Sequence, residues 1–191
     1  MELKERLATF KDELSLIAEK PIRDFVKACI EEAPDYVFED CPSSTSGKYH
    51  PIDEIAPDGT ILHTKRVFAV AYDLARGLEV EHKRDVILAA ALLHDLMKQG
   101  PKRSGHTVHN HPQLMADMIT KVYEERGFRD KLDLEVVQEL YWAVAFHYGP
   151  WTNKSFKKTM PEYSMVELAV YVADYISSKR FIHIDHKRRT D

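Results

Sequence analysis

Residues 87–93 form an uninterrupted apolar run, Ile-Leu-Ala-Ala-Ala-Leu-Leu, and the chain continues directly into His94 and Asp95. A helix at the protein surface carries polar residues on one face, so this run predicts a helix buried at the centre of the fold. An ionised carboxylate and an imidazole at the end of a buried helix are costly unless a partner compensates them. Two interpretations follow: Asp95 caps a neighbouring helix while His94 bonds a backbone carbonyl, or both residues bind a cation.

Apolar residues recur at spacings of three and four along most of the remaining chain, which predicts an all-α fold. The expected helices cover residues 2–19, a segment from Pro21 to about Pro34, and residues 61–77, 81–100, 111–126, 134–146 and 161–176. Between residues 36 and 60 the periodicity disappears and Pro and Gly punctuate a long loop, a feature that is often functional in compact domains. We expect a single domain over residues 1–191, with amphipathic N-terminal helices (2–34), a core (about 43–180) and a polar tail (181–191).

Composition and charge limit the class of protein. The 191 residues, 44% of them hydrophobic, suffice for one sizeable core. The formal net charge of −4 excludes the global basic field of a non-specific nucleic-acid binder. Cys29 and Cys41 have no CxxC spacing and predict neither a disulfide scaffold nor a thiolate zinc site. The charged N-terminal segment is unlike a signal peptide and no apolar run approaches the ~20 residues of a membrane span, so we expect a cytoplasmic protein without a membrane partner.

Four further ionisable residues lie within or at the edges of apolar helical segments, each on a different predicted helix. They are His63, His111, His147 and Asp174. Imidazole and carboxylate ligands together suit Mn, Fe, Zn, Co or Ni. One metal centre accounts for all of these residues together with the His94-Asp95 pair, which favours the cation interpretation.

At these residues the chain resembles the HD superfamily of metal-dependent phosphohydrolases, whose pattern is a histidine, a His-Asp pair and a distal aspartate. LHTKRVFAVA contains His63, LLHDLMK contains His94 and Asp95, and VADYISSKR contains Asp174. The resemblance spans roughly residues 43–180 and implies an HD-type helical bundle with a metal held among the helices by these four residues. With SSTSGKYHP preceding LHTKRV, the chain also resembles the catalytic module of bacterial HD-domain 3′–5′ exoribonucleases and HD nucleotide hydrolases.

The resemblance further implies a second metal. His111-Pro112 and His147-Tyr148-Gly149 stand where members with two metals place extra histidines, and Asp95 would bridge the two ions. Tyr148 departs from the pattern, because many relatives have a second consecutive histidine there. The expected cofactor is therefore a pair of divalent transition metals (Mn, Fe, Co, Ni or Zn, with Mg as an alternative). If one metal binds, His111 or His147 would instead position water or protonate the leaving group.

Cations and aromatic rings near these ligands suggest how a substrate is held. Lys98, one turn beyond Asp95, is the expected catalytic clamp on the phosphate, and Lys48 and Arg66 are expected to support it as substrate contacts. The alternative for each of the three is a solvated surface charge. His109 and His106 are substrate contacts or bystanders, and His50 is a candidate for orienting a ligand from outside the site. The aromatic residues Tyr148, Trp151, Tyr49 and Phe156 could stack on a base, close to a basic cluster of Lys154, Lys157 and Lys158.

The leading hypothesis is a metal-dependent phosphohydrolase that cleaves phosphate esters of nucleotides with a metal-activated water. The alternative is a phosphodiesterase or 3′–5′ exonuclease that acts on short single-stranded or cyclic nucleic acids. A hypothesis of another class is a non-catalytic regulatory module that binds a nucleotide. The amphipathic N-terminal helix would pack on its own bundle or on a second copy, so a homo-oligomer is possible.

Overall fold

The computed structural model describes residues 2–44, 47–152 and 158–187, and no residue in these ranges lies in a strand. The all-α prediction is confirmed. None of the helices in the described ranges is both long enough and apolar enough to cross a membrane. The α-helices are α1 (Leu3–Thr9), α2 (Lys11–Leu16), α3 (Lys20–Glu32), α4 (Tyr36–Glu39), α5 (Gly59–Gly77), α6 (Arg84–Leu93), α7 (His111–Glu125), α8 (Leu134–Ala145) and α9 (Met165–Ser177). Short 3-10 helices are η1 (Ile52–Ile55), η2 (Glu81–Lys83), η3 (Gly149–Trp151) and η4 (Met160–Glu162).

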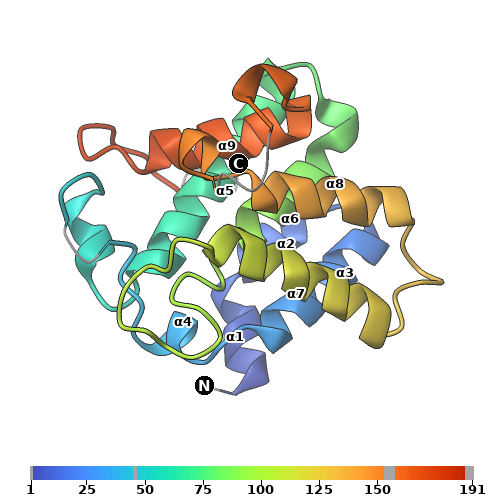
Figure 1. Cartoon of the computed structure of the whole chain (residues 1–191), viewed down its shortest axis with the longest axis horizontal. Helices are drawn as coiled ribbons and strands as arrows, with labels where there is room; N and C mark the ends of the chain where they lie inside the picture. Colours follow the sequence, from blue (N-terminus) through green and yellow to red (C-terminus); the bar gives the residue numbers. More distant parts are fainter. Residues whose placement is uncertain (1, 45–46, 153–157, 188–191) are drawn as a thin grey trace.

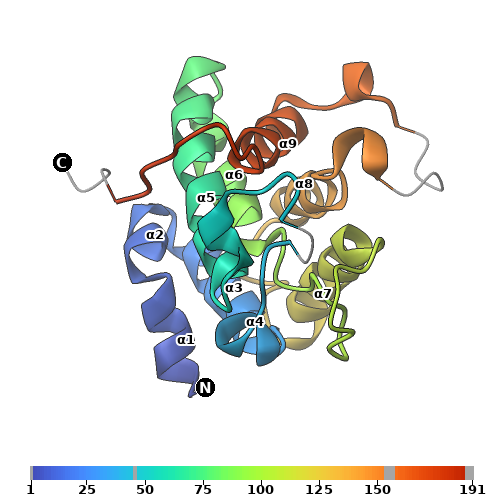
Figure 2. The same cartoon turned by 90° about the vertical axis from the view of Figure 1, so that its left-hand side faces the viewer.

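Helix α6 is the central helix of the bundle, as its apolar run predicts. Every residue of α6 after Arg84 is buried. It packs against α3, α5, α8 and α9, which surround it in the two perpendicular views of Figures 1 and 2. The buried apolar side chains of these helices form one continuous cluster. A helix that buries all its faces can deliver the residues at its end into the protein interior.

The single helix expected over residues 2–19 is wrong, because the chain breaks at Phe10 into α1 and α2. Phe10 has φ −112° and ψ 23°, and its side chain is fully buried with its ring 6.3 Å from that of Phe38, edge-on. Helix α1 itself buries no residue. Burial of the Phe10 ring therefore takes precedence over helical continuity at this point. The next expected helix is confirmed as α3, with Pro21 in its first turn and its end before Pro34.

The long loop between α4 and α5 is folded on itself rather than open. The backbone N–H of Cys41 donates to the carbonyl of Pro57 (2.6 Å), that of Ser43 to Glu54 (2.9 Å) and that of Thr60 to Cys41 (2.8 Å). These bonds satisfy backbone groups that a buried loop could not leave unpaired. The loop encloses η1, and it fixes Glu54 beside the first turns of α5.

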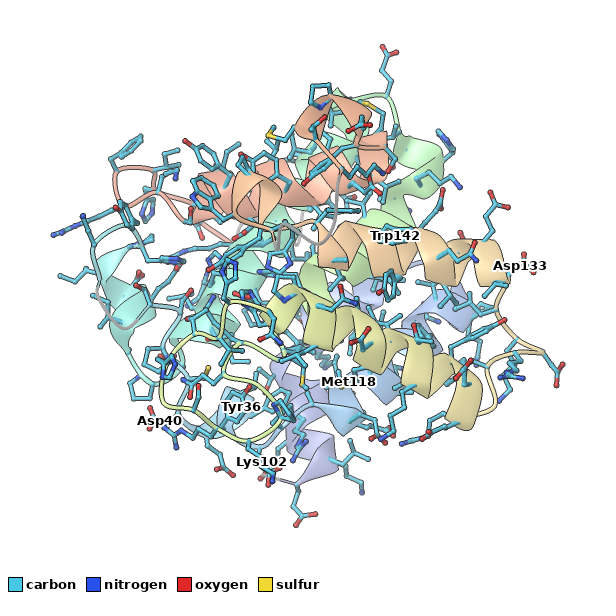
Figure 3. All side chains as sticks on the ribbon, in the orientation of Figure 1. Tyr36, Asp40, Lys102, Met118, Asp133 and Trp142 are labelled. Atoms are coloured by element: carbon cyan, nitrogen blue, oxygen red, sulfur yellow. The ribbon has the colours of Figure 1, made fainter. Side chains whose placement is uncertain are left out.

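The helix expected over residues 81–100 ends earlier, at Leu93, and turns follow it. The Nδ1–H of His94 donates to the carbonyl of Ala91 (2.8 Å), which the backbone N–H of Asp95 would use in a continuing helix. The following connection is anchored by Tyr36, whose hydroxyl donates to the carbonyl of Gly100 (2.8 Å) and accepts from the N–H of Gln99 (3.0 Å) (Figure 3). His94 and Asp95 therefore lie on a fixed turn at the end of the central helix.

The last helix starts at Met165, four residues later than Pro161, where the sequence analysis places its start. Ser164 caps α9: its hydroxyl accepts from the N–H of Glu167 (3.2 Å), and the Glu167 carboxylate accepts from the N–H of Ser164 (2.7 Å). This reciprocal capping box competes with helix formation further upstream. Pro161 belongs to the separate turn η4. The expected helices over 111–126 and 134–146 are confirmed as α7 and α8 within one residue.

Candidate metal centre

Six candidate ligands predicted from the sequence come together at the end of α6. His63 lies on α5, His94 and Asp95 follow α6, His111 begins α7, His147 follows α8, and Asp174 lies on α9. The side chains of five of them are at most 2% exposed, and that of Asp174 is 16% exposed. Their ligand atoms form two groups, each compact enough for one ion: His63, His94 and Asp174, and Asp95, His111 and His147.

Asp95 lies between the two groups, with one carboxylate oxygen toward each. Its Oδ1 is 3.0 Å from His111 Nε2 and 3.7 Å from His147 Nε2. Its Oδ2 is 3.4 Å from His94 Nε2 and 3.9 Å from His63 Nε2. In the first group, His63 Nε2 is 2.9 Å from Asp174 Oδ1. This arrangement places Asp95 where a bridging carboxylate would stand.

Backbone carbonyls fix the orientation of three imidazole rings. The Nδ1 of His94 lies 2.8 Å from the carbonyl oxygen of Ala91, that of His111 2.8 Å from Val108, and that of His147 2.7 Å from Val144. A carbonyl can only accept, so each Nδ1 carries a proton and donates it, and each ring turns its Nε2 toward the centre. Metal-binding histidines are held in this way, with the second ring nitrogen bonded to a carbonyl or a carboxylate.

Two of the inward-facing ligand atoms lack a hydrogen-bond partner among the described residues. His94 Nε2 and Asp95 Oδ1 are buried without a hydrogen-bond partner among the described residues. His111 Nε2 and His147 Nε2 lie 3.2 Å apart, so two ring nitrogens converge on the same point. Buried acceptors that converge on one another are unfavourable unless a cation or proton lies between them. The donor set and its orphaned atoms therefore fit divalent transition metals.

The charges of the centre are set by close pairs. Burial opposes ionisation of Asp95, but the ammonium group of Lys98 and the imidazole of His94 hold the pKa of Asp95 well below its usual range. Lys98 Nζ contacts Asp95 Oδ2 directly, and this lysine is 5% exposed. Burial together with the neighbouring histidines lowers the pKa of His147 to about 3. Near neutral pH, therefore, Asp95 is an anion and His147 is a neutral ligand.

The buried residue Glu54, which the sequence analysis missed, holds the remaining histidine of the centre. Glu54 Oε2 lies 3.2 Å from His63 Nδ1 and 2.8 Å from His50 Nδ1, and the Glu54 side chain is fully buried. Burial opposes protonation of His63, but the carboxylates of Glu54 and Asp174 outweigh it and raise the pKa of His63 to about 9. A carboxylate on the far nitrogen of a metal-binding histidine orients the ring and increases its basicity.

Arg66, an expected substrate contact, instead pairs with two carboxylates. Its guanidinium donates to Glu54 Oε1 (2.7 Å) and to both carboxylate oxygens of Asp53 (2.9 and 2.6 Å), and the residue is 5% exposed. Arg66 follows His63 by three residues and so shares its helix face. That spacing, with the acidic pair of the Ile-Asp-Glu-Ile segment, is the signal that could have identified a buried carboxylate partner.

A cavity of about 510 Å³ opens above the candidate ligands, and it is lined by Asp95, Lys98, His147 and Asp174. Among the expected substrate contacts, His109, Tyr148 and Trp151 line this cavity, and so do His50 and Tyr49. Lys48 is next to the lining, with its Nζ 5.2 Å from the ring centre of Tyr49. Two further rings, which the sequence analysis did not single out, are those of Tyr171 and Tyr175.

The other expected contacts have different surroundings. Lys158 forms an ion pair with Glu167, in which the lysine Nζ lies 2.6 Å from the glutamate Oε2. His106 is exposed, and its Nδ1 lies 3.1 Å from the carbonyl oxygen of Ser104. Lys154, Phe156 and Lys157 lie outside the described residues. The basic cluster expected near Trp151 therefore gains no support from Lys158.

The chain was compared with protein families, curated proteins and solved structures. The family model of the HD domain matches residues 60–179, a segment that includes all six candidate ligands. No curated protein and no solved structure matches the chain. Glu54 and His50 precede the matched segment.

Proposed function

The chain belongs to the HD-domain family, whose members are usually metal-dependent hydrolases of phosphate esters, and on this premise we propose that it hydrolyses phosphate esters of nucleotides. The observation that carries the proposal is the convergence of six candidate ligands, two of whose inward-facing atoms have no partner among the described residues, beside a cavity with aromatic walls. We propose that His63, His94, Asp95 and Asp174 hold one ion, and that His111, His147 and the bridging Asp95 hold a second. Divalent metals in such a site supply Lewis acidity and lower the pKa of water toward ~7.

Residues around the ligands prepare the cavity for an anionic substrate. Lys98 offsets the charge of Asp95 through their direct contact, which reduces the repulsion between that carboxylate and a phosphate. Burial raises the pKa of Tyr148, so its hydroxyl stays protonated near neutral pH and can donate to a phosphoryl oxygen. The ring of Tyr148 packs edge-on against His111, 4.9 Å between centres. We propose that Tyr148 contributes this donor where many relatives have a second histidine.

Aromatic rings support a nucleotide as the ligand of this cavity. Trp151 is 56% exposed, Tyr49 is 61% exposed and both line the cavity, so their faces are accessible to a base. Stacking of a base on an aromatic ring contributes about 1–3 kcal/mol and tolerates any base. The exposure of these two rings also suits an alternative substrate, a short or cyclic nucleic acid cleaved by a phosphodiesterase or 3′–5′ exonuclease.

A hydrolysis screen tests the proposal. Mononucleotides, cyclic nucleotides and labelled oligonucleotides are each incubated with Mn, Co, Ni, Mg and Zn in turn, and the products are resolved by chain length. We expect metal-dependent release of phosphate or nucleotide by the wild type and its loss in Asp95→Asn. Asp133→Asn, a matched change at the start of α8 on the periphery of the molecule (Figure 3), should keep full activity.

The product pattern separates the alternatives. Shortened oligonucleotides indicate an exonuclease, whereas hydrolysis limited to mononucleotides indicates a nucleotidase. Tight binding of one nucleotide without hydrolysis by any metal-loaded form would favour a regulatory module and contradict the proposed activity.

A further inference from the structure

Among the described residues, two lysines line the cavity, Lys98 and Lys179, and they differ in their partners. Lys98 Nζ contacts Asp95, and the residue is buried. Its charge is therefore offset within the metal centre. Lys179 has no carboxylate oxygen within 4.0 Å of its Nζ among the described residues. Of the lysines in the described lining, Lys179 is therefore the one whose charge is available to a ligand.

Lys179 is held in place by an aromatic ring. Its Nζ lies 3.6 Å from the ring centre of Tyr175, which also lines the cavity and is 42% exposed. A cation–π contact of this kind favours one position of the ammonium group and leaves its N–H groups able to donate. The next residue is anchored as well, because the N–H of Arg180 donates to the carbonyl of Tyr49 (2.7 Å). The ammonium group is thus oriented before any ligand binds.

The position of Lys179 along the chain separates it from the metal centre. Asp174, a candidate ligand, lies within α9, and Lys179 follows it by five residues, just beyond the end of the helix. Tyr171, Asp174, Tyr175 and Ser178 line the cavity along the same stretch. A ligand that reaches from the metal centre to Lys179 therefore follows the C-terminal half of α9.

We propose that Lys179, supported by the ring of Tyr175, binds a second phosphate of the substrate, one that is not cleaved. This inference rests on the proposed function, and it narrows the substrate class to nucleotides with more than one phosphate. The second phosphate can belong to a nucleoside polyphosphate or to the neighbouring nucleotide of a short strand. Both present the same chemistry to an ammonium group, an anionic oxygen cluster that accepts charge-assisted hydrogen bonds.

Steady-state kinetics with metal-loaded protein tests the inference on three substrates: a nucleoside triphosphate, a dinucleotide and para-nitrophenyl phosphate, which has one phosphate. The variants are Lys179→Gln, Lys179→Arg and, as a control, Lys121→Gln on the exposed surface of α7. Lys179→Gln should raise KM roughly five- to tenfold for substrates with a second phosphate and leave kcat near the wild-type value. It should leave para-nitrophenyl phosphate unaffected, Lys179→Arg should restore KM, and Lys121→Gln should change nothing.

The comparison of substrates shows which phosphate is bound. An effect on the triphosphate alone indicates a polyphosphate chain, and an effect on the dinucleotide alone indicates a strand. The inference would be overturned if Lys179→Gln lost the same fraction of kcat/KM on all three substrates. It would also be overturned if this variant left KM unchanged for both substrates with a second phosphate.

A binding measurement separates failure of this inference from failure of the proposed function. Calorimetry on metal-free protein compares inorganic tripolyphosphate with orthophosphate, so it requires no turnover. We expect the wild type to bind tripolyphosphate more tightly than Lys179→Gln does, and both proteins to bind orthophosphate equally. Equal tripolyphosphate affinity of the two proteins would contradict the role of Lys179, whereas absence of hydrolysis with this difference intact would contradict the activity alone.

Discussion

At the scale of single residues, His63 differs from the other histidines of the metal centre in what holds its second ring nitrogen. His94, His111 and His147 each bond a backbone carbonyl, whereas His63 Nδ1 faces the fully buried carboxylate of Glu54. A carbonyl fixes a ring by its dipole, and a carboxylate adds a full negative charge. The orientation of His63 therefore depends on one side chain from outside the segment matched by the HD family.

Replacement of Glu54 tests that dependence. Glu54→Gln keeps the size of the side chain but removes its charge, so metal affinity should fall about ten- to a hundredfold. Calorimetric titration of the metal-free protein with Mn or Ni measures the change, and the thermal midpoint verifies the fold. Asp53→Asn is the control, because Asp53 pairs with Arg66 without a contact to His63. Unchanged affinity in Glu54→Gln, or an equal loss in Asp53→Asn, would show that the carboxylate has no such role.

Some residues of the site could be identified from the sequence and others could not. The six candidate ligands could be identified because each lies within or at one end of an apolar helix. The spacing of apolar residues along a helix shows which face is buried, so it also shows that an ionisable residue on that face is buried. Glu54 has no such period around it, because it lies in the four-residue 3-10 helix η1 within the long loop, and the only signal for it is the spacing of Arg66 and His63 on α5. Arg66 shows the same limit: its helix face is predictable, but the partner on that face depends on how the loop folds.

At the scale of elements, the chain segments around the site are fixed by side chains that satisfy backbone groups. His94 ends α6 by occupying the carbonyl of Ala91, and Ser164 with Glu167 begins α9. Apolar residues spaced three and four apart located both helices in the sequence but did not locate these ends. A helix end is set by single hydrogen bonds, which leave no repeating pattern in the sequence. The break at Phe10 has another cause, the burial of one large ring. The helices could be predicted, whereas their ends depend on tertiary contacts.

Gly59 offers a test of the folded loop at this scale. A Cβ atom on Gly59 would lie 1.9 Å from the carbonyl oxygen of Glu54 and 2.9 Å from the N–H nitrogen of Ser43, so Gly59→Ala must displace the loop. We expect a loss of about 1–3 kcal/mol in the free energy of unfolding, measured by urea titration, with weaker metal binding because Glu54 moves.

Gly77→Ala, at the other end of the same helix, is the matched control. No atom lies within 4 Å of a Cβ there, and alanine favours the helix by about 0.5–1 kcal/mol, so this variant should be neutral or more stable. Equal stabilities of the two variants would refute the close contact at Gly59.

At the scale of the whole molecule, the segment matched by the HD family is not separate from the helices that precede it. The match begins at residue 60, yet Phe10, Ile17 and Phe25 are fully buried in the same cluster as the apolar residues of α6. Helix α3 packs against both α6 and α7. The N-terminal helices therefore complete the core beneath the metal centre. The apolar face of residues 2–34 packs on the chain's own helix bundle.

Removal of residues 1–35 tests this integration. The truncated chain should lose cooperative thermal unfolding and expose apolar surface to a hydrophobic dye, because α3 covers two helices of the core. Circular dichroism and dye fluorescence measure both effects. A truncated chain that unfolds cooperatively near the wild-type midpoint would show that the matched segment folds alone.

The reactivity of the two cysteine thiols measures how tightly the same core is closed in the intact chain. Cys29 and Cys41 are fully buried, and burial raises the pKa of both thiols, so the reactive thiolate is doubly disfavoured. Neither thiol should react with a disulfide reagent at pH 8 until the protein unfolds, and both should then react in urea. Rapid reaction of one thiol in native buffer would indicate local opening of its part of the core.

The number of ions retained per chain decides whether the six converging residues hold divalent metal. Metal-free protein is reconstituted with Mn, Co, Ni or Zn, dialysed, and analysed by mass spectrometry of its metal content beside Asp95→Asn. We predict two ions per wild-type chain for at least one of these metals, and a marked loss in the variant, because Asp95 faces both groups of ligands. A wild-type chain that retains no ion, or a variant that retains as many as the wild type, would contradict the account.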